Sequence, residues 1–170
     1  MSASKMNTVP ASALQHATRS LPVSRAILYA TLLVGALDAT DGVVFLGTHG
    51  QNPIQVLQYI ASSLLGAASF ADGPASAGLG LILHFAVSFV VAAIFILASR
   101  RIAVLRTQWV LLGLLYGISV WSVMNLVFLP HTAIVSSTLT EAALANGLIG
   151  HALFVGLPSA FFAKRVEAAA

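Results

Sequence analysis

Four stretches of the chain are long and apolar enough to cross a bilayer, and no other feature constrains the fold as strongly. A spanning helix needs about 20 apolar residues. The four stretches cover approximately residues 26–46, 78–98, 109–129 and 143–163. Spanning strands would alternate apolar and polar residues over about 10 positions, and residues 90–97 show no alternation. The sequence therefore predicts an all-α integral membrane protein, a bundle of four transmembrane helices.

The composition excludes most other classes of protein. Only 8% of the residues are charged and 58% are hydrophobic, whereas a soluble domain has about 25% charged residues. The chain has too few polar residues to cover a water-facing surface. It contains no cysteine, so disulfides, thiolate metal sites and cysteine nucleophiles are excluded.

The connection between the first two spans, residues 49–77, contains a short predicted helix. Pro53 is suited to begin it and Gly66 to end it. Ile54, Leu57, Ile60 and Leu64 recur near helical spacing and would form an apolar stripe. We expect a short amphipathic helix lying in the membrane interface. A lid packed over the bundle fits the same pattern.

The basic residues predict the orientation. All eight lie before the first span, between the second and third, or after the fourth: Lys5, Arg19, Arg25, Arg100, Arg101, Arg106, Lys164 and Arg165. Because basic flanks stay on the cytoplasmic side during insertion, we expect both termini inside (N-in/C-in). This pattern explains the net charge of +3 as an insertion signal, and we expect no binding to nucleic acid.

The predicted organisation is a single transmembrane domain over residues 26–165. Residues 1–25 are expected to form a flexible cytoplasmic tail, and residues 166–170 a cytoplasmic C-terminus. The tail is rich in Ser, Ala and Thr and lacks acidic residues. That composition also suits a mitochondrial transit peptide.

Ionisable groups within a span are costly and are candidates for function. Asp38, His84 and His151 lie on three different spans, each roughly 9–12 Å from the outer edge of the bilayer by helical rise. Ser122 and Asn125 lie on the third span at a similar depth, and Asp41 follows Asp38 by one turn. We therefore expect a polar intramembrane cluster inside the bundle, open toward the outer side.

Three functions fit such a cluster. Polar groups can hold spans together by interhelical hydrogen bonds, or line a pathway for protons or a small solute. They can also bind haem or a metal, since Asp38, His84 and His151 together would supply three zinc ligands. No haem motif or catalytic spacing frames these residues, so we expect no cofactor, no metal and no enzymatic activity.

Small residues and prolines predict features of the last two spans. Gly113 and Gly117 form a G-x-x-x-G pattern, which lets two helices approach closely. The partner would be another span, a second copy of the chain or another membrane protein. Pro158 is expected to kink the fourth span, and Pro130 with His131 to end the third.

Several stretches resemble a known group of proteins: LQYIASSLLGAASFADG (57–73), LGLILHF (79–85), YGISVWSVMNLVFLP (116–130) and GHALFVGLP (150–158). They are similar to small four-span bacterial inner membrane proteins of the YagU type. The match depends mainly on His84, Pro130 and Gly150-His151, and a Gly35-x-x-Asp38 element looks shared. The resemblance implies a multi-pass protein of the bacterial inner (plasma) membrane. It implies no biochemical activity, and a link to acid tolerance is only suggestive.

We therefore expect an inner membrane protein that conducts protons or a small solute through the polar cluster. The alternative is a non-catalytic structural or accessory subunit that binds a partner through the Gly113/Gly117 face. Binding of haem or a metal by the intramembrane histidines is the third hypothesis.

Overall fold

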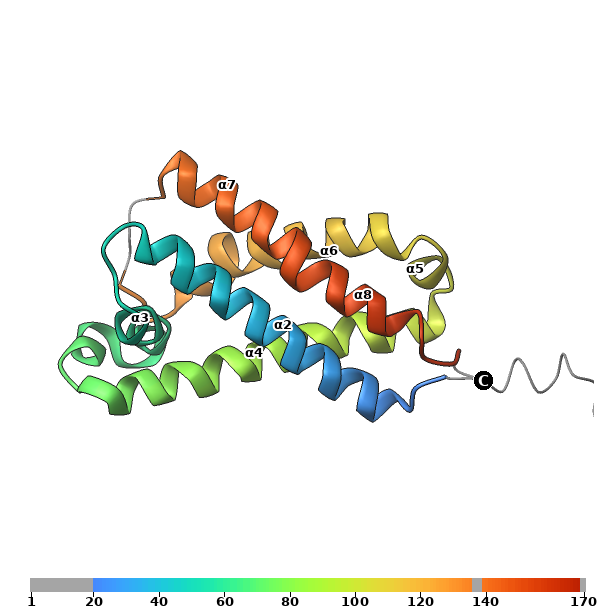
Figure 1. Cartoon of the computed structure of the whole chain (residues 1–170), viewed down its shortest axis with the longest axis horizontal. Coiled ribbons are helices and arrows are strands. Elements are labelled where there is room, and N and C mark those ends of the chain that lie inside the picture. Colours follow the sequence, from blue (N-terminus) through green and yellow to red (C-terminus); the bar gives the residue numbers. More distant parts are fainter. Residues whose placement is uncertain (1–19, 136–138, 169–170) are drawn as a thin grey trace, which may run out of the picture.

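The structure, a computed structural model, describes residues 20–135 and 139–168. This part of the chain is helical, apart from short connections and one isolated bridge. Its helical elements in order are α2 (Val23–Gly47), α3 (Pro53–Leu65), η1 (Gly66–Phe70), α4 (Gly73–Arg101), α5 (Val104–Thr107), α6 (Trp109–Val123), η2 (Met124–Phe128), η3 (Leu129–His131), α7 (Glu141–Gly150), η4 (His151–Gly156) and α8 (Leu157–Ala163). Figure 1 shows the long helices lying side by side in one bundle.

Within the described residues, four helices are long and apolar enough to cross a membrane. They are span one, Val23–Gly47; span two, Gly73–Arg101; span three, Trp109–His131; and span four, Glu141–Ala163. The four predicted spans are therefore confirmed, and three begin two to five residues earlier than expected. Residues 23–25 belong to span one and not to the tail. Residues 1–19 of the predicted tail lie outside the described residues.

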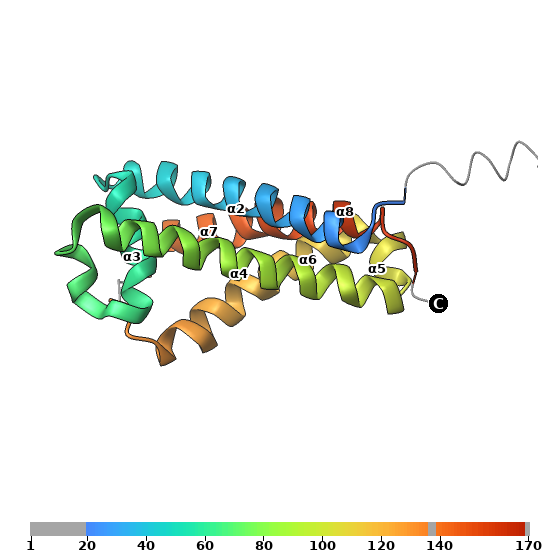
Figure 2. The ribbon, with the colours of Figure 1, turned by 90° about the horizontal axis from the view of Figure 1, so that it is seen from below.

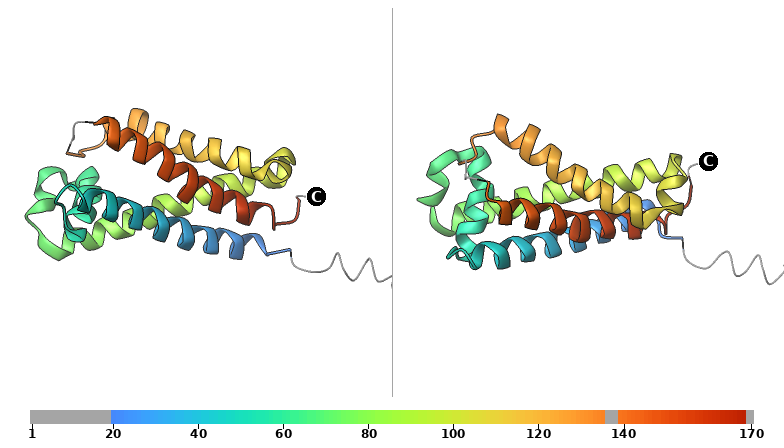
Figure 3. Two further views of the ribbon diagram at one scale, coloured as in Figure 1. Left: turned by 45° about the horizontal axis from the view of Figure 1, so that its top comes forward. Right: turned by 90° about the horizontal axis from the view of Figure 1, so that it is seen from above.

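The described ends of the chain lie together at one end of the bundle (Figure 1). The backbone N–H of Leu21 donates to the carbonyl of Arg165 at 2.8 Å. The α5 connection lies at the same end (Figure 3). We call this the terminal end, and the opposite end, which carries α3, the loop end. Six of the basic residues lie at the terminal end, where Lys164 Nζ sits 3.6 Å from the centre of the Trp109 ring.

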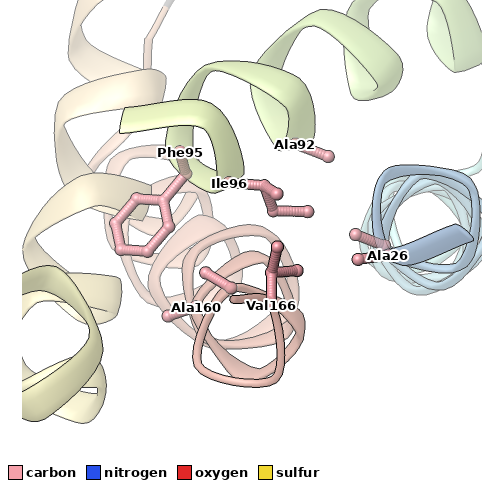
Figure 4. Close-up of a cluster of buried hydrophobic side chains, with 8 residues drawn as sticks. Ala26, Ala92, Phe95, Ile96, Ala160 and Val166 are labelled. Atoms are coloured by element: carbon pink, nitrogen blue, oxygen red, sulfur yellow. The ribbon is translucent and has the colours of Figure 1, made fainter. Parts of the chain in front are cut away.

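The terminal half of the bundle is tightly packed. Its buried cluster is made largely of alanines, with Phe95, Ile96 and Val166 filling the space between them. Figure 4 shows Ala26 of α2 facing Ala92 and Ile96 of α4, with Val166 beside them. Alanine side chains let α2, α4 and α8 approach closely, which in a membrane replaces the hydrophobic driving force of soluble cores.

The helix predicted between spans one and two is present as α3. Asn52 and Gln55 form a reciprocal capping box at its start, Pro53 occupies the first turn, and Gly66 ends it with a φ of 59°. Figure 1 shows α3 end-on, so it runs across the direction of the spans.

The face of α3 that packs on the bundle is more polar than the sequence pattern indicated. Its buried residues include Gln58 and Ser62. Gln58 Nε2 donates to the Gly73 carbonyl at 2.9 Å, and Ser62 Oγ accepts from the Val135 N–H at 3.2 Å. Ile54 and Leu64 of the predicted stripe are instead exposed, whereas Leu57 and Ile60 border internal cavities. These contacts place α3 over the loop end, as in the lid alternative.

Spans three and four each change from α to π geometry part-way along. In span three the Leu129 N–H bonds to the Met124 carbonyl, and in span four the Leu157 N–H bonds to the Ala152 carbonyl. A proline follows each π segment, Pro130 and Pro158. Proline has no N–H to continue the α pattern. The expected irregularity at Pro158 is therefore a π segment, and span three ends at His131 as predicted.

Candidate functional site

The loop half of the bundle encloses a cavity of about 340 Å³, which we call the main cavity. Each of the four spans contributes a polar side chain to its wall: Asp38, His84, Asn125 and His151. Tyr59 and Ser63 of α3 close it from the loop end. The remaining lining is mostly apolar. A largely apolar cavity of this size with a few converging polar groups is typical of small-molecule sites.

Asp38 and His151 face each other across the junction of spans one and four. The distance from Asp38 Oδ1 to His151 Nδ1 is 3.6 Å, and both side chains are about one-fifth exposed, at 21% and 23%. That distance is too long for a hydrogen bond. His151 Nδ1 is buried and has no hydrogen-bond partner among the described residues. An unsatisfied buried nitrogen is costly, and a small shift of either side chain, which closes the 3.6 Å gap or admits a bridging group, would satisfy it.

His84 is held by the backbone of span one. Its Nε2 lies 2.9 Å from the Gly35 carbonyl oxygen. A carbonyl oxygen only accepts, so Nε2 carries a proton. Gly35 also lets the neighbouring Phe85 ring lie against the backbone of span one, because a Cβ there would collide with that ring. The Gly35-x-x-Asp38 element thus joins the position of His84 to the position of the carboxylate.

A second hollow of about 270 Å³ lies on the loop-end side of the same polar groups, and we call it the vestibule. It shares six lining residues with the main cavity: Asp38, Tyr59, Ile60, His84, Asn125 and His151. Asp41 lies in the vestibule and accepts a hydrogen bond of 2.9 Å from Asn146 Nδ2. The polar groups therefore form the partition between the vestibule and the deeper cavity.

Two glycines in span four make room for the vestibule side chains. A Cβ at Gly147 would collide with the indole of Trp121, and one at Gly150 would lie 2.6 Å from Asp41 Oδ2. The indole and the carboxylate therefore sit directly against the span-four backbone.

The structure brings together five of the six residues of the expected cluster: Asp38, Asp41, His84, Asn125 and His151. Ser122 borders neither hollow, and its hydroxyl donates to the Ile118 carbonyl at 2.9 Å within its own helix. Sequence reasoning missed Tyr59 and Asn146. Asn146 could have been found from the sequence, because it is a polar amide on span four between Glu141 and His151. No sequence feature indicated Tyr59, because its position depends on how α3 folds over the bundle.

Toward the terminal end the main cavity is closed by apolar side chains. Val34, Val91 and Val155 form a buried cluster at its floor, each no more than 8% exposed. Tyr116 packs against these valines and donates from its hydroxyl to the Val91 carbonyl at 2.7 Å. We call the three valines the valine barrier. Beyond it lies the alanine-rich core of the terminal half.

The Gly113/Gly117 face packs against span four of the same chain. A Cβ at Gly117 would collide with the His151 carbonyl, and one at Gly113 would press on Ala160 and Gly156. Gly156 in turn lies against Gly113. This face is therefore occupied within the bundle.

The described residues contain no group of three or more His, Asp or Glu side chains placed to hold a metal ion. His84 is turned toward the Gly35 carbonyl, and only His151 faces Asp38. The three-ligand arrangement considered from the sequence is therefore not formed.

Comparison with known proteins gives no further guide to the site. No protein-family model, curated protein or solved structure matches the chain.

Proposed function

We propose that the chain is a membrane protein that binds a small solute or protons in its loop half and moves them across the bilayer. The main support is that all four spans place a polar side chain on the wall between two adjacent hollows. Polar groups that only held the bundle together would not need a cavity beside them. The cavity of about 340 Å³ has room for several water molecules, which favours a solute with several heavy atoms.

The Asp38–His151 pair is the proposed binding centre. A carboxylate accepts hydrogen bonds and an imidazole both donates and accepts, so a group between them would be held from two sides. The same pair can exchange a proton through a bridging hydroxyl or water. The valine barrier supports a gated pathway, because passage to the terminal side requires these side chains to separate.

We further propose that the loop end faces the outside of a bacterial inner membrane. The support is the gathering of basic residues at the terminal end, together with the resemblance to YagU-type proteins. Contact with a partner protein, the accessory-subunit alternative, would have to use a surface other than the Gly113/Gly117 face.

Access of water to the cavity is the first test, and the absence of cysteine makes single-cysteine variants informative. Asn125 lines both hollows, whereas the side chain of Leu126 is 65% exposed on the outer surface of the same helix. The two variants are Asn125→Cys and Leu126→Cys. We expect a membrane-impermeant maleimide added at the loop end to label Asn125→Cys and not Leu126→Cys. Failure to label Asn125→Cys would contradict the proposal.

Proton flux into proteoliposomes loaded with a pH-sensitive dye tests the role of Asp38. Asp38→Asn keeps the shape of the side chain and removes its charge. We expect it to slow the flux at least about tenfold, because the bridging acceptor is weakened. Asp72→Asn is the matched control, since Asp72 is exposed at the start of α4 and borders neither hollow. Equal loss in both variants would indicate a general charge effect and not a pathway.

A further inference from the structure

The main cavity has an apolar groove beside it, on the outer surface of the bundle. A groove of about 530 Å³ runs between spans two and three, and we call it the lateral groove. It shares six lining residues with the main cavity: Leu83, Val87, Val91, Val120, Met124 and Phe128. The two hollows are therefore adjacent, and we call the layer of shared side chains between them the portal.

The geometry of spans two and three explains the lateral groove. They meet near the middle of the bundle, where Tyr116 bonds to Val91 and its ring lies 4.8 Å from that of Phe95. From there they diverge toward the loop end, as Figure 2 shows for α4 and the continuation of α6. The loop end of span three is tied to α3 instead, through the Ala133 N–H and the Ser63 carbonyl at 3.0 Å. The portal is thus framed by α4, span three and α3.

The main cavity and the lateral groove beside it differ in polarity. The lateral groove has no charged residue, and Ser119 and Tyr116 are its polar members. It follows α4 from Leu83 to Ile94, a rise of roughly 16 Å. In the main cavity Asp38 is the only Asp or Glu, and no Lys or Arg lines it. An occupant that fits both parts has an apolar chain and a small polar head.

We propose that the solute is a single-chain amphiphile with an uncharged, hydroxyl-bearing head, which enters from the bilayer between spans two and three. This inference rests on the proposed function and names its substrate class. His151 Nδ1 has almost no accessible surface in the structure, so the Asp38 and His151 side chains must move apart for a hydroxyl to enter between them. The hydroxyl would then donate to Asp38 Oδ1 and accept from His151 Nδ1. It would satisfy the buried nitrogen of His151. A phosphate or carboxylate head would instead place a second negative charge beside the Asp38 carboxylate, where the cavity lining offers His84 and His151 but no Lys or Arg.

Trp121 provides a reporter for the test. The chain has two tryptophans, and Trp109→Phe leaves Trp121 alone beside Asn125 and the vestibule. Trp121 is only 6% exposed, so contact with ordinary boundary lipid is small. The probe is a monoacylglycerol with a brominated chain, added in increasing mole fraction to phosphatidylcholine nanodiscs that contain the full chain. We expect quenching of Trp121 that saturates at low mole fraction.

Matched variants assign the quenching to the portal. Val87 lines both the main cavity and the lateral groove, so Val87→Phe should narrow the portal and raise the half-saturating mole fraction at least about tenfold. Val110→Phe makes the same change at an exposed valine that borders none of these spaces and should have no effect. Val120→Phe narrows the portal from span three, in case Val87→Phe does not fold.

Asp38→Asn should weaken binding by a similar factor, because the head loses its charged acceptor.

The outcomes are distinguishable. Quenching that rises linearly and equally in Val87→Phe, Val120→Phe and Val110→Phe would reflect boundary lipid and would overturn the proposal. A brominated fatty acid that saturates at a lower mole fraction than the monoacylglycerol would overturn the assignment of an uncharged head. If Asn125→Cys is labelled from water while no saturable quenching occurs, the pathway stands and the amphiphile is excluded. Saturable quenching without that labelling would support the amphiphile and contradict a water-accessible pathway.

Discussion

At the scale of single residues, glycines determine how closely spans three and four approach. Gly117 lies against the His151 carbonyl, and Gly113 and Gly156 lie against each other. These contacts bring the backbone of span four next to span three at the depth of the polar cluster. The position of His151 therefore depends on a residue that carries no side chain.

Substitution of Gly117 tests this dependence. In Gly117→Ala the added methyl group would overlap the His151 backbone, and we expect a loss of about 1–3 kcal/mol in the free energy of unfolding. Gly78→Ala is the control, because a Cβ at Gly78 meets no atom within 4 Å and alanine favours the helix by about 0.5–1 kcal/mol. Thermal unfolding in detergent measures both. Equal stability of the two variants would show that spans three and four are not in close contact at Gly117.

The identity of the polar residues was predictable at this scale, but their partners were not. Asp38 and His151 stand out because ionisable groups are rare within spans. The 3.6 Å separation of the pair and the hydrogen bond from His84 to Gly35 depend on the rotation of each helix. Ser122 has the depth of the cluster but the wrong rotation, and it therefore bonds within its own helix.

At the scale of elements, the two π segments lie where spans three and four reach the cavity. Asn125 belongs to Met124–Phe128, and His151 begins His151–Gly156. A π turn contains one residue more than an α turn. The extra residue rotates the helical segment before the turn relative to the segment after it. The turn in span four thereby lets α8 pack on the terminal core while His151 faces Asp38. π turns recur at functional sites.

Restoring the α pattern in span four should displace His151. Pro158→Ala supplies the missing N–H, and reversion to α geometry would rotate His151 by roughly 100° relative to α8. We expect His151→Cys in this background to react with a water-soluble maleimide at least about fivefold more slowly than in the parent, because the side chain leaves the cavity. Pro53→Ala is the matched control, since Pro53 lies in the first turn of α3, where no N–H is required. Unchanged labelling in Pro158→Ala would show that the proline does not maintain the π turn.

At the scale of the whole molecule, the bundle has a packed half and a hollow half. The terminal half contains the alanine-rich core, and the loop half contains the cavity, the vestibule and the portal. The valine barrier separates them. The proposed pathway requires this asymmetry, with a binding space on one side of the valine barrier and a closed core on the other.

The orientation of this asymmetry is predicted by charge. Because the basic residues flank the terminal end, we expect Thr107→Cys to be protected from an impermeant maleimide in intact cells and Gln51→Cys to be labelled. Both positions are exposed in the structure, so the contrast reports the side of the membrane and not burial. Labelling of Thr107→Cys alone would reverse the orientation and place the cavity on the cytoplasmic side.

The sequence by itself determined the number and approximate bounds of the spans, and the bounds of α3. These depend on local properties, namely the length of each apolar run, the capping residues Asn52 and Gln55, and the turn at Gly66. Only the tertiary structure decided which side chains share a cavity. Large apolar residues lie around the whole circumference of each span, so hydrophobicity gives the spans no preferred rotation. Close contacts at Gly35, Gly113 and Gly117 set the rotation instead. The portal between spans two and three follows from the same cause, because glycines draw span three onto span four and leave it apart from span two.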